Sequence, residues 1–344
     1  MKRLALVMIA RDEAHCIARC LESARALVDE MIELDTGSSD ATVEIARQYG
    51  AQVHSFDWRD DFSEARNAAL GYSSSAWNLV LDADERLDTA AGAAFDAVLA
   101  GPPLIGLLPV ASEFDLQGRV ERATSWVARL LPRDVRYTGR IHEQPESALP
   151  RLRIALAVTH DGYREANLSR KRGRNEMLLL RALDDTPEDA YLLYQLGKTL
   201  EIDGDFERAV PRYREALALS ARDAPFRHDL VVRAIFSMKK TGLHAEAIRL
   251  ADIEMANWEN SPDYYFALGD LLLDWATCNP DAADELLPMV EASFRRCLAI
   301  GDQPQLEGSV SGRGSHLAAH NLVVLYDSLG EAALADEYRP LAKR

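Results

Sequence analysis

The sequence is poor in cysteine, in long apolar runs and in positive charge, and each shortage excludes a class of protein. Only four of its 344 residues are cysteines, at positions 16, 20, 278 and 297, and no CxxC pair occurs. A disulfide framework is therefore not expected, nor is a structural zinc site built on CxxC pairs. A reducing, cytoplasmic compartment is the simplest prediction.

Apolar runs are short throughout the chain. The N-terminal stretch Leu4–Ala10 ends at three charged residues, Arg11, Asp12 and Glu13. A spanning helix needs about 18 or more apolar residues, and no run approaches that length. We therefore expect a buried strand at residues 4–10 rather than a signal peptide, and no transmembrane segment.

Basic residues are outnumbered, with 39 Lys and Arg against 55 Asp and Glu, so the formal net charge is −16. Binding to nucleic acid or to an anionic membrane requires a broad positive field, which this balance does not supply. Nucleic acid is therefore not an expected partner, although local basic pockets remain possible.

The first half of the sequence alternates short apolar runs with segments of helical periodicity. This pattern predicts strands near residues 4–10, 31–34, 53–56 and 77–81, with helices between them. Extended runs follow, the last of them at residues 152–159. The prediction is an α/β domain at residues 1–165 with a mixed sheet, whose ligands bind beyond the carboxyl ends of the parallel strands.

From about residue 168 the strand pattern gives way to a helical repeat. The spacing of Gly197, Leu200, Ala209 and Tyr213 matches the 34-residue tetratricopeptide pattern of two antiparallel helices. Gly197 and Ala209 would lie where the two helices cross closely. Weaker copies follow at residues 228–262, 263–302 and 316–342, and the second of these has an insertion near residues 278–281. Residues 166–344 are therefore predicted to form an all-α solenoid of tetratricopeptide-like repeats.

Two acidic segments follow predicted strands. Asp82-Ala83-Asp84 comes directly after an apolar strand, and two carboxylates at this spacing can hold Mg²⁺ or Mn²⁺, which bridges the oxygens of a diphosphate. The segment 35–40 (DTGSSD) follows another strand and opens a helix, where nucleotides bind in such sheets. Asp40 fits the cap of that helix, which leaves Asp35 without a capping role.

Seven segments in this order resemble the family 2 glycosyltransferases of the GT-A fold. They are residues 8–13 (MIARDE), 20–23 (CLES), 35–40 (DTGSSD), 60–67 (DDFSEARN), 81–85 (LDADE), 139–144 (GRIHEQ) and 160–163 (HDGY). With the repeats, the set looks like the bacterial subgroup that has a tetratricopeptide tail. That subgroup includes the sublancin-type peptide S-glycosyltransferases and enzymes of surface glycans.

The resemblance implies a nucleotide-sugar site on the first domain. Asp35 would receive the N3–H of a uracil-type base, opposite a wall made by residues 10–13, and Arg66 would lie near the diphosphate. Asp82 would approach the ribose or the metal, and Asp84 would be the direct metal ligand. The nucleotide-sugar-binding residues are therefore Ala10, Arg11, Glu13, Asp35, Arg66, Asp82, Ala83 and Arg129.

The chemistry implied is a single displacement at the anomeric carbon, which inverts it and needs a base for the acceptor. Glu143 is the preferred base and His142 the alternative. These two neighbours would point to opposite faces if the local backbone were a strand. His160 would join Asp84 and Asp82 as a metal ligand, with Mn²⁺ or Mg²⁺ as the cofactor.

The sequence thus predicts a metal-dependent glycosyltransferase that takes a sugar from a nucleotide-sugar, a UDP-sugar by resemblance. Its acceptor would be a peptide, a protein or a surface glycan, docked in part on the repeats. Whether the repeats also form a homodimer is left open by the sequence. One alternative is a nucleotide-sugar-binding repeat scaffold without turnover. Another is a nucleotidyltransferase, which the absence of an N-terminal Gly-rich phosphate loop disfavours.

Overall fold

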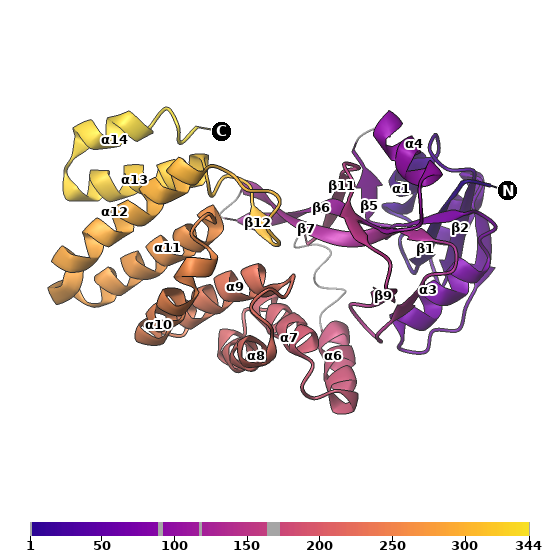
Figure 1. Cartoon of the computed structure of the whole chain (residues 1–344), viewed down its shortest axis with the longest axis horizontal. Coiled ribbons are helices and arrows are strands. Elements are labelled where there is room, and N and C mark those ends of the chain that lie inside the picture. The colour runs from indigo at the N-terminus through magenta and orange to yellow at the C-terminus, as the bar shows by residue number, and fades with distance from the viewer. Residues whose placement is uncertain (1, 89–91, 117–118, 164–172, 344) are drawn as a thin grey trace. The chain divides into compact units, whose positions relative to one another are not determined.

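The computed structural model describes residues 2–88, 92–116, 119–163 and 173–343. These residues form two compact units, Met1–Ala182 and Leu183–Arg344, whose elements are labelled in Figure 1. The boundary predicted between residues 165 and 166 falls in the segment 164–172, outside the described residues. The two units are described separately below.

The first unit is built on a mixed sheet with the strand order β3-β2-β1-β4-β7-β6-β11-β5. The strands β1 to β4 are parallel, β7 runs antiparallel to both β4 and β6, and β10 pairs with β6. The strands are β1 (Leu4–Ala10), β2 (Glu30–Asp35), β3 (Gln52–Ser55), β4 (Trp77–Val80), β5 (Glu85–Leu87), β6 (Ile105–Leu116), β7 (Arg119–Pro132), β10 (Arg151–Arg153) and β11 (Val158–Tyr163). A separate pair joins β8 (Arg136–Thr138) to β9 (Gln144–Glu146).

Helices cover the sheet, which is why its central strands are apolar on both faces. From β1, Leu6 and Met8 lie in the same apolar cluster as Ile17 of α1, while Val7 lies in a second cluster with Leu70 of α3. The helices of this unit are α1 (Ile17–Ala24), α2 (Thr42–Gln48), α3 (Phe62–Gly71) and α4 (Ala93–Ala100), and α6 (Arg174–Asp185) spans the boundary. The predicted mixed α/β domain is confirmed.

One predicted extended run divides in two. Residues 152–159 were expected as one stretch, but β10 and β11 pair with successive parts of β6. Between them the amide of Ile154 donates to the Leu107 carbonyl at 2.9 Å, and the amide of Leu156 donates back to the Ile154 carbonyl at 2.9 Å. The second bond closes a tight turn, so the chain leaves β6 and rejoins it.

The second unit consists of helical hairpins. Consecutive helices pair as α7 (Ala190–Ile202) with α8 (Phe206–Leu219), α9 (Arg227–Lys240) with α10 (His244–Glu254), α11 (Pro262–Cys278) with α12 (Ala283–Ile300), and α13 (His316–Leu329) with α14 (Ala332–Tyr338) (Figure 1). These are the helices that the repeat predicts. The expected insertion near residues 278–281 includes a short 3₁₀ turn at Pro280–Ala282.

The first hairpin shows why the repeat needs a glycine. A Cβ atom on Gly197 would lie 2.6 Å from the ring of Tyr213, and Tyr213 is fully buried. The Tyr213 hydroxyl donates to the Glu201 carboxylate at 2.6 Å, which fixes the ring against α7. The close crossing predicted at Gly197 is confirmed.

None of the helices in the described ranges is long and apolar enough to cross a membrane.

Candidate functional site

The carboxyl ends of β1, β2 and β4 bring the predicted residues to one edge of the sheet. Ala10 and Asp35 are register partners at the ends of β1 and β2. Asp82 follows two residues after β4, which pairs with β1 through Val7 and Val80. Side chains separated by dozens of residues therefore meet where ligands bind in open α/β sheets.

Asp35 organises the loop that follows β2. Its carboxylate accepts the amides of Gly37 at 3.2 Å and Ser38 at 3.1 Å, and Gly37 has a φ of 101° that glycine adopts without strain. Two amide donors leave acceptor positions on the carboxylate for a ligand. The carbonyl of Ala10 accepts both the amide and the hydroxyl of Thr36, at 3.0 and 3.1 Å, so the two loops are joined at their bases.

The loop after β1 is also fixed. The Asp12 amide donates to Ser38 Oγ at 3.0 Å, and the Asp12 carboxylate accepts the Ser39 amide at 2.7 Å. The hydrogen bond from the Ser39 amide is the main reason why the pKa of Asp12 is below its usual value. Arg11 is exposed, whereas the Glu13 carboxylate accepts the Cys16 thiol at 3.2 Å, toward α1.

Beside these loops lies a group that we call the arginine–carboxylate cluster, made of Arg66, Asp82, Glu85, Arg129 and Glu143. Asp82 lies between the two guanidinium groups, 2.6 Å from Arg66 Nη2 and 2.7 Å from Arg129 Nη2. Arg129 Nη2 also donates to Glu85 at 2.5 Å, and Arg66 Nε donates to Glu143. The cluster connects α3, β7, the turn after β4, the start of β5 and the segment before β9.

Burial and charge act in opposite directions within the cluster. Burial opposes the ionised form of Asp82, but Arg129 and Arg66 outweigh it and hold the pKa of Asp82 well below its usual range. Burial raises the pKa of Glu85 despite the nearby Arg129. Asp82 therefore stays anionic, and both arginines stay cationic.

The cluster has donor capacity that the protein does not use. Among the described residues, Nη1 of Arg66 and Nε of Arg129 are buried and have no hydrogen-bond partner. Leaving buried guanidinium donors without a partner costs free energy, so such donors commonly serve a ligand. Guanidinium groups match the geometry of phosphate oxygens.

Asp84, in the turn just before β5, and His160, on β11, form a carboxylate–imidazole pair. Nε2 of His160 lies 3.2 Å from Oδ2 of Asp84, and the opposite ring nitrogen lies 3.2 Å from Ser112 Oγ. The side chain of His160 is 14% exposed and that of Asp84 is 10% exposed. Oxygen and imidazole donors this close fit a divalent cation such as Mn²⁺ or Mg²⁺. Ala83, between the two aspartates, is buried in the apolar core.

Glu143 and His142 do not lie in a strand. They precede β9, and His142 has a φ of 50°, in the left-handed region, so the alternation of a strand does not apply here. The expectation of opposite faces rested on a strand and is corrected. Glu143 is nearly buried, with a side chain 10% exposed, and it contacts Arg66.

Sequence reasoning gave no role to Glu85 or Tyr137. Glu85 accepts the Asp82 amide at 3.0 Å as well as Arg129, so it holds both partners in place. The Tyr137 ring lies 5.8 Å from the Arg66 guanidinium, and burial raises the pKa of Tyr137 to about 12. Asn67 fixes Tyr137 through two bonds of 2.8 Å to its backbone. The acidic run LDADE and the neighbouring Arg66-Asn67 pair were the available sequence signals.

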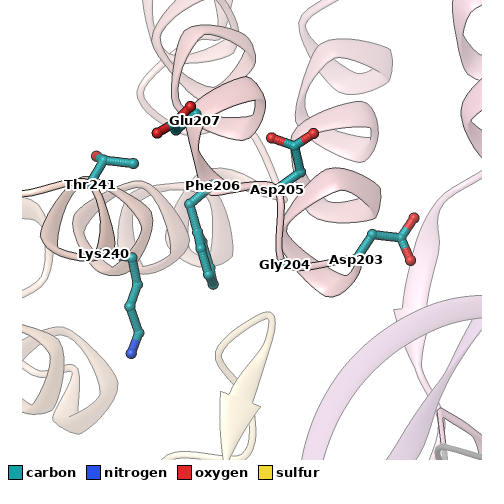
Figure 2. A pocket seen from close by; sticks show the side chains of 7 residues that line it. All are labelled: Asp203, Gly204, Asp205, Phe206, Glu207, Lys240 and Thr241. Carbon is teal, nitrogen blue, oxygen red and sulfur yellow. The ribbon is translucent and has the colours of Figure 1, made fainter.

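A cavity of about 430 Å³ lies elsewhere, in the second unit. It is lined by the turn between α7 and α8 and by the end of α9, and Figure 2 shows its acidic side chains with Lys240. The lining residues are Asp203, Gly204, Asp205, Phe206, Glu207, Lys240 and Thr241. None of the predicted site residues belongs to this cavity.

Comparison with known proteins places a family match on the first unit. Residues 5–91 match the model of the family described as glycosyl transferase family 2. An uncharacterized glycosyltransferase of Rickettsia felis is 37% identical over 87 residues, which cover 25% of this chain and 30% of the relative.

Two relatives match across more of the chain. A TPR repeat-containing protein of Synechococcus elongatus is 34% identical over 256 residues, covering 70% of this chain and 63% of the relative. The prophage-derived glycosyltransferase SunS of Bacillus subtilis is 28% identical over 220 residues, which cover 61% of this chain and 52% of the relative. This chain thus spans less than two thirds of either relative.

Residues 5–91 of the first unit therefore match the family 2 glycosyltransferases and lie in a GT-A-like mixed sheet, and a helical region similar to tetratricopeptide repeats follows. This is the organisation that the seven segments and the repeat pattern predict.

Proposed function

We propose that this protein is a metal-dependent, inverting glycosyltransferase that transfers a sugar from a UDP-sugar to a peptide, protein or surface-glycan acceptor. The family match supports glycosyl transfer, and the similarity to SunS supports an enzyme with this domain order. The donor and the stereochemistry are inferred from the site, and the acceptor classes are those that the resemblance to family 2 enzymes with a tetratricopeptide tail implies.

One observation carries the proposal. At the edge where β1, β2 and β4 end, Asp84, which is paired with the His160 imidazole, lies in the same turn as Asp82, the carboxylate held between two buried arginines. A scaffold that only displays repeats has no need of buried charges, which are costly to desolvate. A diphosphate bound with a divalent cation requires both kinds of group.

Asp84 and His160 would hold the cation, since their facing atoms are the oxygen and nitrogen donors that Mn²⁺ accepts. When bound, the cation would neutralise the charge that develops on the nucleoside diphosphate leaving group. Asp82 is assigned to the nucleotide-sugar rather than to the cation, because both its carboxylate oxygens already accept hydrogen bonds from the arginines.

Arg66 and Arg129 would bind the diphosphate. Asp82 fixes both guanidinium groups before the donor arrives, so little side-chain entropy remains to be lost on binding. Their unused donors, Nη1 of Arg66 and Nε of Arg129, are available to phosphate oxygens after a small movement.

Asp35 would recognise the base. Its carboxylate is held by the amides of Gly37 and Ser38 and keeps acceptor positions for the N3–H of uracil. Cytosine carries no proton on that nitrogen, so a carboxylate discriminates against it. Residues 10–13, tied to the Asp35 loop through Thr36 and Ser38, form the opposite wall.

Glu143 would take the proton from the acceptor nucleophile as that nucleophile bonds to the anomeric carbon and the nucleoside diphosphate leaves. Arg66 orients the Glu143 carboxylate, and the same guanidinium contacts Asp82, so one side chain aligns the base with the leaving group. A single displacement of this kind inverts the anomeric centre.

The test is calorimetric titration of the whole chain with UDP, GDP and CDP, each with and without Mn²⁺. We expect UDP to bind only with Mn²⁺ and the other two nucleotides to bind at least about tenfold more weakly. UDP-sugars are then screened for donor hydrolysis and for transfer to peptides and glycans. Binding without turnover toward any acceptor favours the scaffold alternative, and no nucleotide binding contradicts the proposal.

A further inference from the structure

Three metal-binding side chains of different types converge in the second unit, on the facing helices α10 and α11. They are His244, the first residue of α10, with Asp274 and Cys278, which lie one turn apart on α11. One ligand atom from each residue lies within 4.8 Å of the others. We propose that these three side chains bind one Zn²⁺ ion.

Contacts within the unit hold the three groups in position. Nε2 of His244 lies 2.7 Å from Oδ2 of Asp274, so the imidazole and the carboxylate already face each other. The imidazole plane is within 5° of the Trp275 indole plane, which limits rotation of the ring. The next carboxylate along α11, Asp270, is paired with Lys239 at 2.5 Å and does not compete.

Spacing on α11 explains why two ligands share one side. Residues four apart on a helix lie on the same face, so Asp274 and Cys278 project together toward the start of α10. The His244 side chain is 12% exposed and that of Asp274 is 43% exposed, while Cys278 is exposed, so an ion can reach the group from solvent.

The donor set selects the kind of metal. A thiolate, an imidazole and a carboxylate are the ligands that Zn²⁺ takes, with water in the fourth tetrahedral position. Mg²⁺ and Mn²⁺ prefer oxygen ligands and gain little from a thiolate. On binding, the Cys278 thiol releases its proton to solvent. The ion takes the place of the proton between Nε2 of His244 and Asp274, and the neutral imidazole carries its one proton on Nδ1.

The bound ion would join two successive hairpins, because α10 closes one and α11 opens the next. A ligand that binds only the folded state stabilises that state by mass action. Zn²⁺ would therefore stiffen the repeat domain between its second and third hairpins.

The test uses Co²⁺ as a spectroscopic substitute for Zn²⁺ in the whole chain under reducing conditions. We expect one equivalent of Co²⁺ to produce a thiolate-to-cobalt charge-transfer band, which Zn²⁺ abolishes by displacement. The site at Asp84 and His160 contains no thiol, so Co²⁺ bound there cannot produce this band. This readout is independent of glycosyl transfer.

Matched cysteine variants locate the thiolate. Cys278→Ser should remove the band and weaken Zn²⁺ binding by at least about tenfold, and His244→Ala should also weaken binding. Because Cys278 is exposed, its serine variant should fold normally. The control is Cys16→Ser, since Glu13, His15 and Cys16 form the other described cluster of this type. The Cys16→Ser variant should keep the charge-transfer band.

Two results would overturn the proposal. One is the absence of a charge-transfer band at one equivalent of Co²⁺ in the unmodified chain. The other is a band that persists in Cys278→Ser and disappears in Cys16→Ser, which would assign the thiolate to the first unit.

Discussion

Arg66 donates a hydrogen bond from Nε to the carboxylate of Glu143, a residue 77 positions further along the chain. The same guanidinium donates through Nη2 to Asp82. The group proposed as the base and the carboxylate proposed to face the donor therefore share one cation. A change at Arg66 must act on both.

Removing Arg66 should destabilise the first unit. Arg66→Ala leaves Glu143 without its arginine and Asp82 with Arg129 alone, and we expect a loss of about 2 kcal/mol, less than for a fully buried pair because Asp82 is 35% exposed. Urea unfolding of the variant measures the loss. The control is Arg59→Ala, which breaks an exposed pair with Glu64 and should cost about 0.5 kcal/mol or less. Equal losses for the two variants would contradict the structural role of Arg66.

Glu143→Gln should reduce turnover far more than donor binding. The amide keeps the size of the side chain but cannot take a proton, so we expect kcat to fall by about 100-fold or more. Steady-state kinetics and UDP titration separate the two effects. Glu146→Gln, on β9 and exposed, is the matched control and should behave as wild type. Wild-type turnover in Glu143→Gln would transfer the role of base to His142.

Asp84→Asn should weaken binding of the metal ion and abolish glycosyl transfer. Without its carboxylate, the pair with His160 loses the negative charge that attracts the cation. Mn²⁺ titration should show binding weakened by at least about tenfold. The exposed Asp57→Asn is the control. In wild type, chelation should abolish turnover and added Mn²⁺ should restore it; full turnover after chelation would exclude the site.

Glu33 should make folding stability depend on pH. It is fully buried, neither carboxylate oxygen has a partner among the described residues, and burial with help from Asp35 raises its pKa from 4.5 to about 8. Between these values the folded state keeps a proton that the unfolded state releases. Stability attributable to Glu33 is therefore complete below about pH 4.5 and is lost as the pH rises to about 8, by about 1.4 kcal/mol per unit.

The variant Glu33→Gln isolates this contribution. Its stability relative to wild type should increase with pH between 5 and 8, because the amide does not titrate. Urea unfolding at several pH values gives the slope, which is independent of any constant offset from the substitution. Glu44→Gln, exposed on α2, should give no slope. A flat difference for Glu33→Gln would mean that the carboxyl is ionised in the folded protein.

Gly197→Ala should destabilise the second unit. An added methyl group would lie 2.6 Å from the Tyr213 ring, and the clash should outweigh the gain in helix propensity, for a net loss of about 1–2 kcal/mol. Thermal or urea unfolding tests this. Gly71→Ala, at the end of α3 with open space around it, should be neutral or slightly stabilising. A stabilised Gly197→Ala would mean that α7 and α8 can separate.

The residues at the ends of strands could be predicted from sequence, because each follows a short apolar run. Asp35 is the last residue of β2 and Asp82 follows β4 by two residues, and parallel neighbours bring the carboxyl ends of these strands to one edge. Contacts across the sheet could not be predicted from the sequence. Arg129 meets Glu85, 44 positions away, only because β7 runs antiparallel beside β4, and no local pattern encodes that pairing.

Local backbone conformation was the other limit. The segment GRIHEQ suggested an extended run, yet His142 adopts a left-handed conformation that non-glycine residues rarely take. The periodicity of side chains depends on a regular backbone, so it could not show where Glu143 points. The pairing of Glu143 with Arg66 emerges only from the folded chain.

The contact between Gly197 and Tyr213 also limits how the repeat domain can change over generations. A larger side chain at position 197 becomes tolerable only after position 213 has lost its ring, and that loss by itself leaves a void between the helices. Descendants of this sequence should therefore alter the two positions together or retain both. Whole hairpins, by contrast, can be gained or lost with the contacts between their own two helices intact.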